Sequence, residues 1–447
     1  MRFLLSSIVA CLILASSRAA EPAYQAGVAS VNITPSEFIW MAGYGSRNKP
    51  AEGKQHDLFA KAVALQDAGG KRLVIVTTDL VGLPRSLTTP AAVEIEKKTS
   101  LPRECLMFTS SHTHCGPVIR DNLADMYDIT PEMREKIAKY TDELQNKLVQ
   151  VVTEAVHDLK PAVLHTGKGT GRFAVNRRQV TPNGVINGNN PGGPVDHDVP
   201  VLRVSTPEGK LRAVIFGYAC HNTTLQFYHW CGDYAGFAQL EIQQKHPEAT
   251  ALFFMGCGAD ANPLPRSTVE LCKKYGHELA SAAEDVLKSD KLMPVLGRFT
   301  ARYGEIELPF DAIPTRDQWT ADLLSKNFAQ RTRAARFIQQ LDEGRKIDDH
   351  YRHYPVQVWK LGDLIWIALG GEVVVDYSYR LKRELGSDHT IWVTGYANDV
   401  MAYIPSLRVL KEGGYEADSS MIYYGLPSKW GPSIEEKIVA KVKELAK

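Results

Sequence analysis

Two histidines separated by one residue, His112 and His114, lie in the stretch SSHTHCGP at positions 110–117. Imidazole binds transition metals and exchanges protons near neutral pH, so this pair suits a metal centre, or a metal ligand beside a proton shuttle. The apolar run at 106–109 is typical of a buried strand. In an extended segment, residues i and i+2 face the same side, which predicts that both rings point into one cavity. A solvated pair at a strand end would have the same spacing, so the assignment depends on further ligands.

Other apolar runs also end in residues that can bind a metal or a polar ligand. These runs cover 72–79, 212–221, 251–260, 363–372 and 390–399, and their ends carry Asp79, His221, Asp260, Glu372, and Asn398 with Asp399. Ligands of open α/β sheets bind outside the carboxyl ends of strands, so these groups are predicted to meet at one rim. A catalytic zinc site needs three or four ligands and an open position for water, and His221 is the natural third candidate.

Glu372 is the natural carboxylate candidate for this site. It follows two glycines, which allow another backbone segment to approach closely. A helix is predicted to follow it directly, and the helix dipole alone favours a carboxylate at such a position. The residue type by itself therefore leaves both roles open.

Amphipathic stretches alternate with the strand-like runs. They predict helices over 131–159, 267–289, 316–345 and 433–447, the second opening with a Ser-x-x-Glu capping pattern. The stretch 176–200 is rich in Asn, Gly and Pro and predicts a long loop or short hairpin at the site. The alternation predicts an α/β fold with a mixed β-sheet core layered with helices, and with the active site at the C-terminal ends of strands.

Composition excludes several classes of protein. The chain has 447 residues, 44% of them hydrophobic and 23% charged, with a net charge of +1 and no long basic run, so nucleic acid is not an expected partner. Beyond position 20 the cysteines show no C-x-x-C spacing, which argues against a cysteine-based zinc site. The even number beyond position 20 permits disulfides in an exported protein, but buried free thiols are predicted for most of the six: Cys105, Cys115, Cys220, Cys231, Cys257 and Cys272.

The first residues have the pattern of a secretory signal peptide. Arg2 precedes a mostly apolar stretch at 3–15, and small residues offer cleavage sites near positions 19 and 20. The stretch 8–11 is only loosely similar to a lipoprotein cleavage site. We therefore expect residues 1–20 to be removed and the protein to be exported, either to a periplasm or as a secreted protein.

Taken together, the motifs make the chain resemble the catalytic domain of the neutral/alkaline non-lysosomal ceramidase family. They occur in the family's order over almost all of the mature chain: VNITP (31–35), MAGYGS (41–46), SSHTHCGP (110–117), NRR (176–178), DHDVPVLRV (196–204), ACHNTTL (219–225), GDYAGFA (232–238), GCGADANP (256–263), GGEVVVDYSYRLKREL (370–385), GYANDVMAYIP (395–405) and GGYEA (413–417).

The resemblance implies a zinc amidase that cleaves the N-acyl bond of ceramide or a related lipid amide, with peripheral membrane contact. It implies one Zn²⁺ per chain, with His112, His221, Glu372 and Tyr403 as its ligands. It further implies His114 as general acid/base, with Arg177 and Tyr415 orienting the amide and stabilising the oxyanion. Residues 21–447 are expected to form a single hydrolase domain without the C-terminal immunoglobulin-like domain of ceramidases.

The residues leave two other functions open. Asp79, Asp260 and Asp399 could supply a two-metal cluster, as in a phosphoesterase, and an esterase could use the single-metal site. A non-catalytic exported binding protein could also be built on this scaffold. The sequence departs from the family's usual pattern in having Cys115 and Asn262 where the family has serine, which bears on the substrate more than on the metal.

Overall fold

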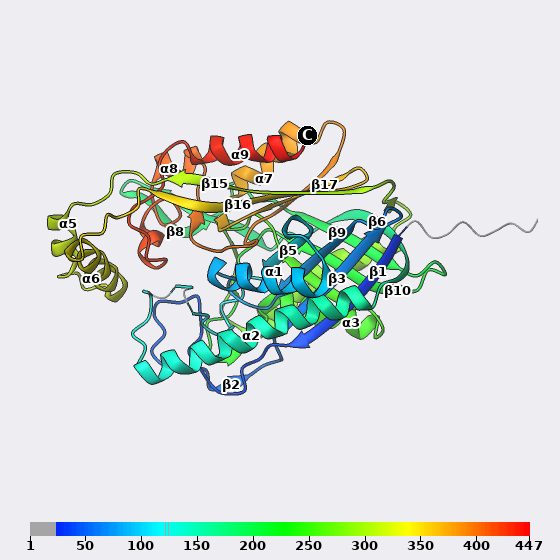
Figure 1. The fold of residues 1–447 in the computed structure, drawn as a ribbon, viewed down its shortest axis with the longest axis horizontal. Coiled ribbons are helices and arrows are strands. Elements are labelled where there is room, and N and C mark those ends of the chain that lie inside the picture. Colours follow the sequence, from blue (N-terminus) through cyan, green and yellow to red (C-terminus); the bar gives the residue numbers. More distant parts are fainter. Residues whose placement is uncertain (1–23, 121, 124) are drawn as a thin grey trace, which may run out of the picture.

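A nine-stranded mixed sheet forms the larger half of the computed structural model, which describes residues 24–120, 122–123 and 125–447 (Figure 1). The predicted signal peptide at 1–20 lies outside these residues. The strand order is β12-β10-β9-β6-β1-β3-β4-β5, with β14 paired to β6. The bounds are β1 (Tyr24–Asn32), β3 (Phe59–Asp67), β4 (Arg72–Thr78), β5 (Leu106–Ser110), β6 (Lys160–Thr170), β9 (Asp198–Ser205), β10 (Leu211–Tyr218), β12 (Thr250–Met255) and β14 (Met293–Pro294).

A second, four-stranded sheet has the order β15-β16-β17-β19. Its bounds are β15 (Phe299–Pro309), β16 (His350–Leu361), β17 (Leu364–Leu369) and β19 (Thr390–Thr394). The pairs β4–β5, β10–β12 and β17–β19 are parallel, whereas the other pairs within these two sheets are antiparallel. Every residue of β5 and β17 is buried, as expected for apolar strands covered on both faces. The predicted mixed sheet is confirmed.

Helices cover both sheets. α1 (Arg85–Thr99) and α2 (Pro131–His157) pack together, and α2 lies against β1 and β3, while α3 (Asp233–Lys245) and α4 (Val269–Lys288) pack near β12 and β6. α7 (Val375–Leu385) and α9 (Ile434–Leu445) cover the second sheet. α4 starts one residue later than its capping pattern suggests, because the hydroxyl of Thr268 accepts from the backbone N–H of Leu271.

The single helix predicted over 316–345 is wrong. The structure has two helices there, α5 (Arg316–Asp322) and α6 (Phe328–Asp342). The side chain of Asn327 accepts hydrogen bonds from the backbone N–H groups of Ala329 and Gln330, so it begins a new helix. The two helices form a hairpin around Trp319, Ala334 and Phe337, set apart from the sheets (Figure 1).

Short elements connect the sheets to the site. The predicted hairpin within 176–200 is present as β7 (Ala174–Thr181) and β8 (Gly184–Asn190), with β13 (Ala261–Pro263) paired to β7. Two further pairs are β2 (Gly53–Lys54) with β11 (His229–Trp230), and β18 (Glu372–Val373) with β20 (Tyr403–Ile404). The remaining elements are η1 (Arg103–Cys105), α8 (Leu407–Glu412) and η2 (Ser419–Ile422).

The two sheets contribute to two large hydrophobic clusters that meet at the ends of β5, β12 and β19. Isolated bridges between Gly256 and Thr394 and between Thr109 and Ala397 join the two halves there. Among the described residues, no helix has the length and apolar character needed to span a bilayer.

The structure predicts that the thiols of the folded protein are unreactive. The cysteines at 105, 115, 220, 231, 257 and 272 are all free and buried. Burial disfavours the thiolate and so raises the pKa of these thiols, Cys115 and Cys220 among them. Titration with a thiol reagent should give almost no reaction in the native state of a chain starting at residue 24, and six thiols after denaturation. Two or more fast-reacting thiols in the native protein would contradict the burial.

Candidate metal centre

Four predicted ligands meet between the two sheets. The Nε2 atoms of His112 and His221 each lie 3.1 Å from one carboxylate oxygen of Glu372. The hydroxyl of Tyr403 lies 3.2 Å from Nε2 of His221. All four side chains are at least 96% buried, the most exposed being Tyr403 at 4%. The fold therefore brings together the three candidates at strand ends, His112, His221 and Glu372, with Tyr403, which only the family resemblance implied.

The two imidazoles present lone pairs to the carboxylate. Nδ1 of His112 contacts the carbonyl oxygen of Val81 at 2.6 Å, and Nδ1 of His221 contacts that of Gly258 at 2.9 Å. A carbonyl oxygen only accepts, so Nδ1 carries the proton in both rings and Nε2 is left as an acceptor. Burial, followed by the nearby charge of Arg177, lowers the pKa of His221 to about 3, so this ring stays neutral.

Glu372 stays ionised despite its burial. Burial alone would raise its pKa, but the contacts with His112 and His221 outweigh this and hold the pKa well below its usual range. That lowering requires a positive charge beside the carboxylate, because with both rings neutral the three groups would direct lone pairs toward each other. Acceptors arranged in this way repel one another unless a cation lies between them.

The spacing of these donors fits a metal ion. Two ligands bound at about 2.0–2.1 Å in a tetrahedron lie about 3.3 Å from each other. The observed separations of 3.1 Å, 3.1 Å and 3.2 Å are close to that value. Nitrogen and oxygen donors with their outer Nδ1–H groups held by carbonyls are the set that Zn²⁺ takes in proteins. The residues therefore fit the metal that the resemblance implies.

His112 reaches the site in a different way from the one predicted. β5 ends at Ser110, and His112 has a φ of 61°, so the His-x-His stretch is not extended. The left-handed residue turns the chain, and the rings of His112 and His114 still meet, with centroids 4.7 Å apart. Both rings do share one cavity, but a turn after the strand produces this arrangement.

Glu372 and Tyr403 are placed by direct pairing of their backbones. They are opposite each other in the parallel pair β18–β20. Gly371 makes this possible, because its φ is 73° and a Cβ there would lie 2.5 Å from Ile404 and 2.7 Å from the carbonyl oxygen of Ala402. The close backbone approach predicted from the two glycines is present.

His114 lies beside the cluster and borders a loop at 43–47. Its Nε2 is 3.1 Å from Nε2 of His112, and one ligand atom from each of His112, His114 and His221 lies within 4.8 Å of the others. The side chain of Arg47 donates to the carbonyl oxygen of His114 at 2.7 Å, and Tyr44 packs edge-on against the ring. Burial, followed by the two neighbouring imidazoles, lowers the pKa of His114 well below its usual value, so the ring is a neutral proton acceptor.

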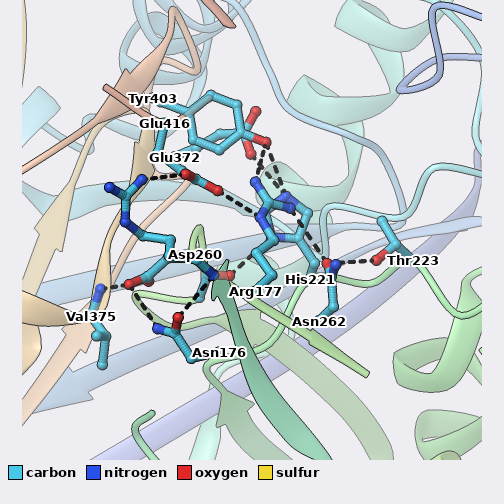
Figure 2. A network of polar contacts seen from close by, with 12 residues as sticks. Asn176, Arg177, His221, Thr223, Asp260, Asn262, Glu372, Val375, Tyr403 and Glu416 are labelled. Atoms are coloured by element: carbon cyan, nitrogen blue, oxygen red, sulfur yellow. Dashed lines mark hydrogen bonds and ion pairs between the residues drawn. The ribbon is translucent and has the colours of Figure 1, made fainter. Parts of the chain in front are cut away.

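Arg177 connects the cluster to a buried carboxylate (Figure 2). Its guanidinium donates to the hydroxyl of Tyr403 at 3.1 Å and to Glu416 at 2.7 Å. Arg178 donates to the other oxygen of Glu416 at 2.6 Å. Neighbouring strand residues normally face opposite sides, but the register of β7 shifts between Asn176 and Arg178, and this irregularity lets both arginines reach one carboxylate.

Tyr415 is half-buried and lies over the same cluster. Its ring centroid is 5.2 Å from that of Tyr403 and 5.7 Å from the Arg177 guanidinium carbon. The structure thus places His114, Arg177 and Tyr415, the three residues implied for catalysis, around the four predicted ligands.

The other acidic candidates serve the fold. Asp79 accepts from the backbone N–H of Phe59, and Asp260 accepts from that of Val375 (Figure 2). Asp399 accepts from the backbone N–H of Arg85 and from the hydroxyl of Tyr351. Within the described residues, one group of three histidine, cysteine or acidic side chains has its ligand atoms within 4.8 Å of one another, namely His112, His114 and His221; it contains two of the four predicted ligands and the neighbouring His114.

Two residues at the site were not identified from the sequence. Glu416 belongs to the motif GGYEA, so its position beside Tyr415 was a usable signal. Tyr424, whose hydroxyl donates to Glu372, lies in no motif that we recognised.

The fold and the site define an α/β protein with a buried centre suited to one metal ion, and comparisons with known proteins specify the class further. The structure is similar to a ceramidase described as complexed with C2, with 17% identity and a TM-score of 0.73 over 95% of this chain and 75% of that one. It is also similar to neutral ceramidase from Pseudomonas aeruginosa, with 18% identity and a TM-score of 0.70 over 95% and 74% of the two chains.

Residues 24–263 match the N-terminal part of the neutral/alkaline non-lysosomal ceramidase family. The chain therefore belongs to this family, as the resemblance of its motifs predicted. No curated protein sequence matches it significantly. The family and fold make it a hydrolase with the ceramidase architecture.

Metal binding is the first test of this centre. The wild-type protein should bind one divalent ion per chain. His112→Ala should weaken metal binding by more than about 100-fold, because loss of a residue that only hydrogen-bonds to a metal ligand already lowers metal affinity about 10–100-fold. Metal content after dialysis, measured by mass spectrometry, gives the stoichiometry. His277→Ala is the matched control, because this exposed ring pairs only with Glu241 in the described structure. Full retention of metal by the His112 variant would contradict the assignment.

The buried Glu416 carboxylate should be needed for stability. Glu416→Gln leaves Arg177 and Arg178 without their shared anion, and loss of one partner of a buried pair costs about 3–5 kcal/mol of unfolding free energy. Denaturant unfolding measures this change. Glu412→Gln is the control: this carboxylate also pairs with Arg178 but is 31% exposed, so its loss should cost less. Equal effects of the two variants would contradict the prediction.

Proposed function

We propose that the protein is an exported zinc-dependent amidohydrolase that cleaves the N-acyl bond of ceramide or a related lipid amide. The observation that carries this proposal is the convergence of His112, His221, Glu372 and Tyr403: each histidine Nε2 lies 3.1 Å from Glu372, and the Tyr403 hydroxyl lies 3.2 Å from His221. Membership of the ceramidase family supports the substrate class, and the similar solved structures support the fold.

When bound, the ion would lower the pKa of a water molecule and polarise the substrate carbonyl. His114 is neutral and lies beside the ligand set, so its imidazole can accept a proton from the attacking water and return it to the leaving amine. The guanidinium of Arg177 and the phenol of Tyr415 lie beside the predicted ligands. Both groups can donate hydrogen bonds to the carbonyl oxygen of the substrate as it gains negative charge.

The arrangement of the acidic residues disfavours a two-metal phosphoesterase. Such enzymes need a cluster of carboxylates around two ions about 3.5–4 Å apart. Asp79, Asp260 and Asp399 accept backbone hydrogen bonds at separate places instead. Cys115 is also an unsuitable nucleophile, because burial raises the pKa of its thiol and its Sγ faces the carbonyl oxygen of Leu225.

We further propose that residues 21–447 act as one catalytic unit after removal of residues 1–20. His112 and His221 follow strands of the larger sheet, whereas Glu372 follows a strand of the second sheet and pairs with Tyr403. Both halves are therefore needed for the site. The mass of the protein recovered from the exporting host gives the cleavage position.

Substitution of His114 separates catalysis from metal binding. His114→Ala should release fatty acid from a labelled N-acylsphingosine about 10²–10⁴-fold more slowly than wild type, because general acid–base catalysis contributes that much, while one metal ion per chain is retained. Turnover and metal content are measured on the same preparations, with His277→Ala as control. Loss of the metal in this variant would make His114 a ligand instead. Metal-loaded wild type that cleaves esters but no lipid amide would overturn the amidase assignment.

A further inference from the structure

We propose that Tyr424 is a positioning residue that fixes which oxygen of Glu372 faces the metal, and that helix α6 holds Tyr424 in place through Arg336. This inference rests on the proposed metal site and assigns a function to the α5–α6 hairpin, which lies away from the sheets.

The two oxygens of Glu372 have different partners. Oε2 is the atom that lies 3.1 Å from Nε2 of both His112 and His221, so it is the oxygen directed at the ion. Oε1 accepts a hydrogen bond from the hydroxyl of Tyr424. A carboxylate only accepts, so the phenol is the donor, and its proton occupies the oxygen that the histidines leave free. Binding through one oxygen is favoured as a result, because the second is already engaged.

Tyr424 packs against both large hydrophobic clusters, and side chains of α6 bind the backbone that follows it. It follows η2 (Ser419–Ile422), and the next residue, Gly425, accepts a hydrogen bond through its carbonyl oxygen from Arg336 at 2.6 Å. The same guanidinium group donates to Asp125 at 2.6 Å. Arg333, one turn earlier in α6, donates to the carbonyl oxygen of Leu426 at 3.2 Å.

Two arginines of α6 therefore hold the backbone on the C-terminal side of Tyr424. The α5–α6 hairpin has its own small hydrophobic core around Trp319 and Phe337, and this packing fixes the position of the helix that carries the two arginines. Partners of metal ligands orient the ligand and typically contribute 10–100-fold to metal affinity. The hairpin would act on the metal through this chain of contacts, from α6 to Gly425, Tyr424 and Glu372.

The test compares Tyr424→Phe with Tyr423→Phe. Both variants remove one hydroxyl from neighbouring residues, but of the two only the hydroxyl of Tyr424 reaches Glu372 in the described chain. Zn²⁺ affinity is measured by competition with a chelator. Tyr424→Phe should bind about 10–100-fold more weakly, whereas Tyr423→Phe should stay within about twofold of wild type.

A spectroscopic readout separates positioning from a general loss of structure. With Co²⁺ in place of Zn²⁺, the visible absorption of Tyr424→Phe should change in position and intensity, because the freed oxygen of Glu372 can then also bind. Arg336→Ala should alter affinity in the same direction but less, with an unchanged unfolding midpoint of the metal-free protein.

The outcomes separate the two proposals. Wild-type protein that binds neither Zn²⁺ nor Co²⁺ would overturn the proposed metal site itself. Wild type that binds both, together with a Tyr424→Phe variant of unchanged affinity and spectrum, would overturn the role of Tyr424 alone. Arg336→Ala with wild-type affinity, beside a weakened Tyr424→Phe, would overturn the role of α6.

Discussion

Buried imidazole nitrogens and a carboxylate oxygen face one another at the centre of this structure. The Nε2 atoms of His112 and His221 each lie 3.1 Å from one oxygen of Glu372, in a place that water scarcely reaches. Such an arrangement costs free energy unless a cation compensates it, since buried charge must be paired. The unusual local geometry nearby serves to hold these acceptors together: the left-handed backbone of His112, the approach of β20 to Gly371 and the shifted register of β7.

The position of this cluster also links the two halves of the molecule. Two of its histidines follow strands of the nine-stranded sheet, and its carboxylate and phenol come from the β18–β20 pair beside the second sheet. A ligand that binds only the folded arrangement stabilises it by mass action. Occupation of the centre is therefore expected to hold both sheets together, since neither half carries the full set of donors.

Much of this could be predicted from the sequence, because residue types and strand ends are local signals. The apolar runs before His112, His221 and Glu372 predicted strands that the structure contains, and their polar ends do meet. The prediction that the His-x-His stretch is extended was wrong. His112 has a positive φ, and nothing in the local sequence indicates a positive φ at a histidine. Tyr424 was missed for a related reason. Its contact with Glu372 depends on how α6 holds a turn more than 80 residues away in the chain, and no periodicity encodes that contact.

The charges around the centre bear on which substrates it suits. Arg177 and Arg178 are matched by Glu416 and Glu412, so these four side chains add no net charge. In the proposed enzyme, a divalent ion together with Glu372 would leave one positive charge at the site. A neutral amide that gains negative charge on its oxygen in the transition state would be stabilised by that residual charge, with Arg177 and Tyr415 placed to donate to the same oxygen. Because the arginines are already neutralised by their carboxylates, they offer little additional attraction to a substrate that arrives as an anion, such as a phosphodiester. Under the same proposal, the ion pairs of Glu416 would act on selectivity as well as on stability, since they would confine the net positive charge to the position of the metal.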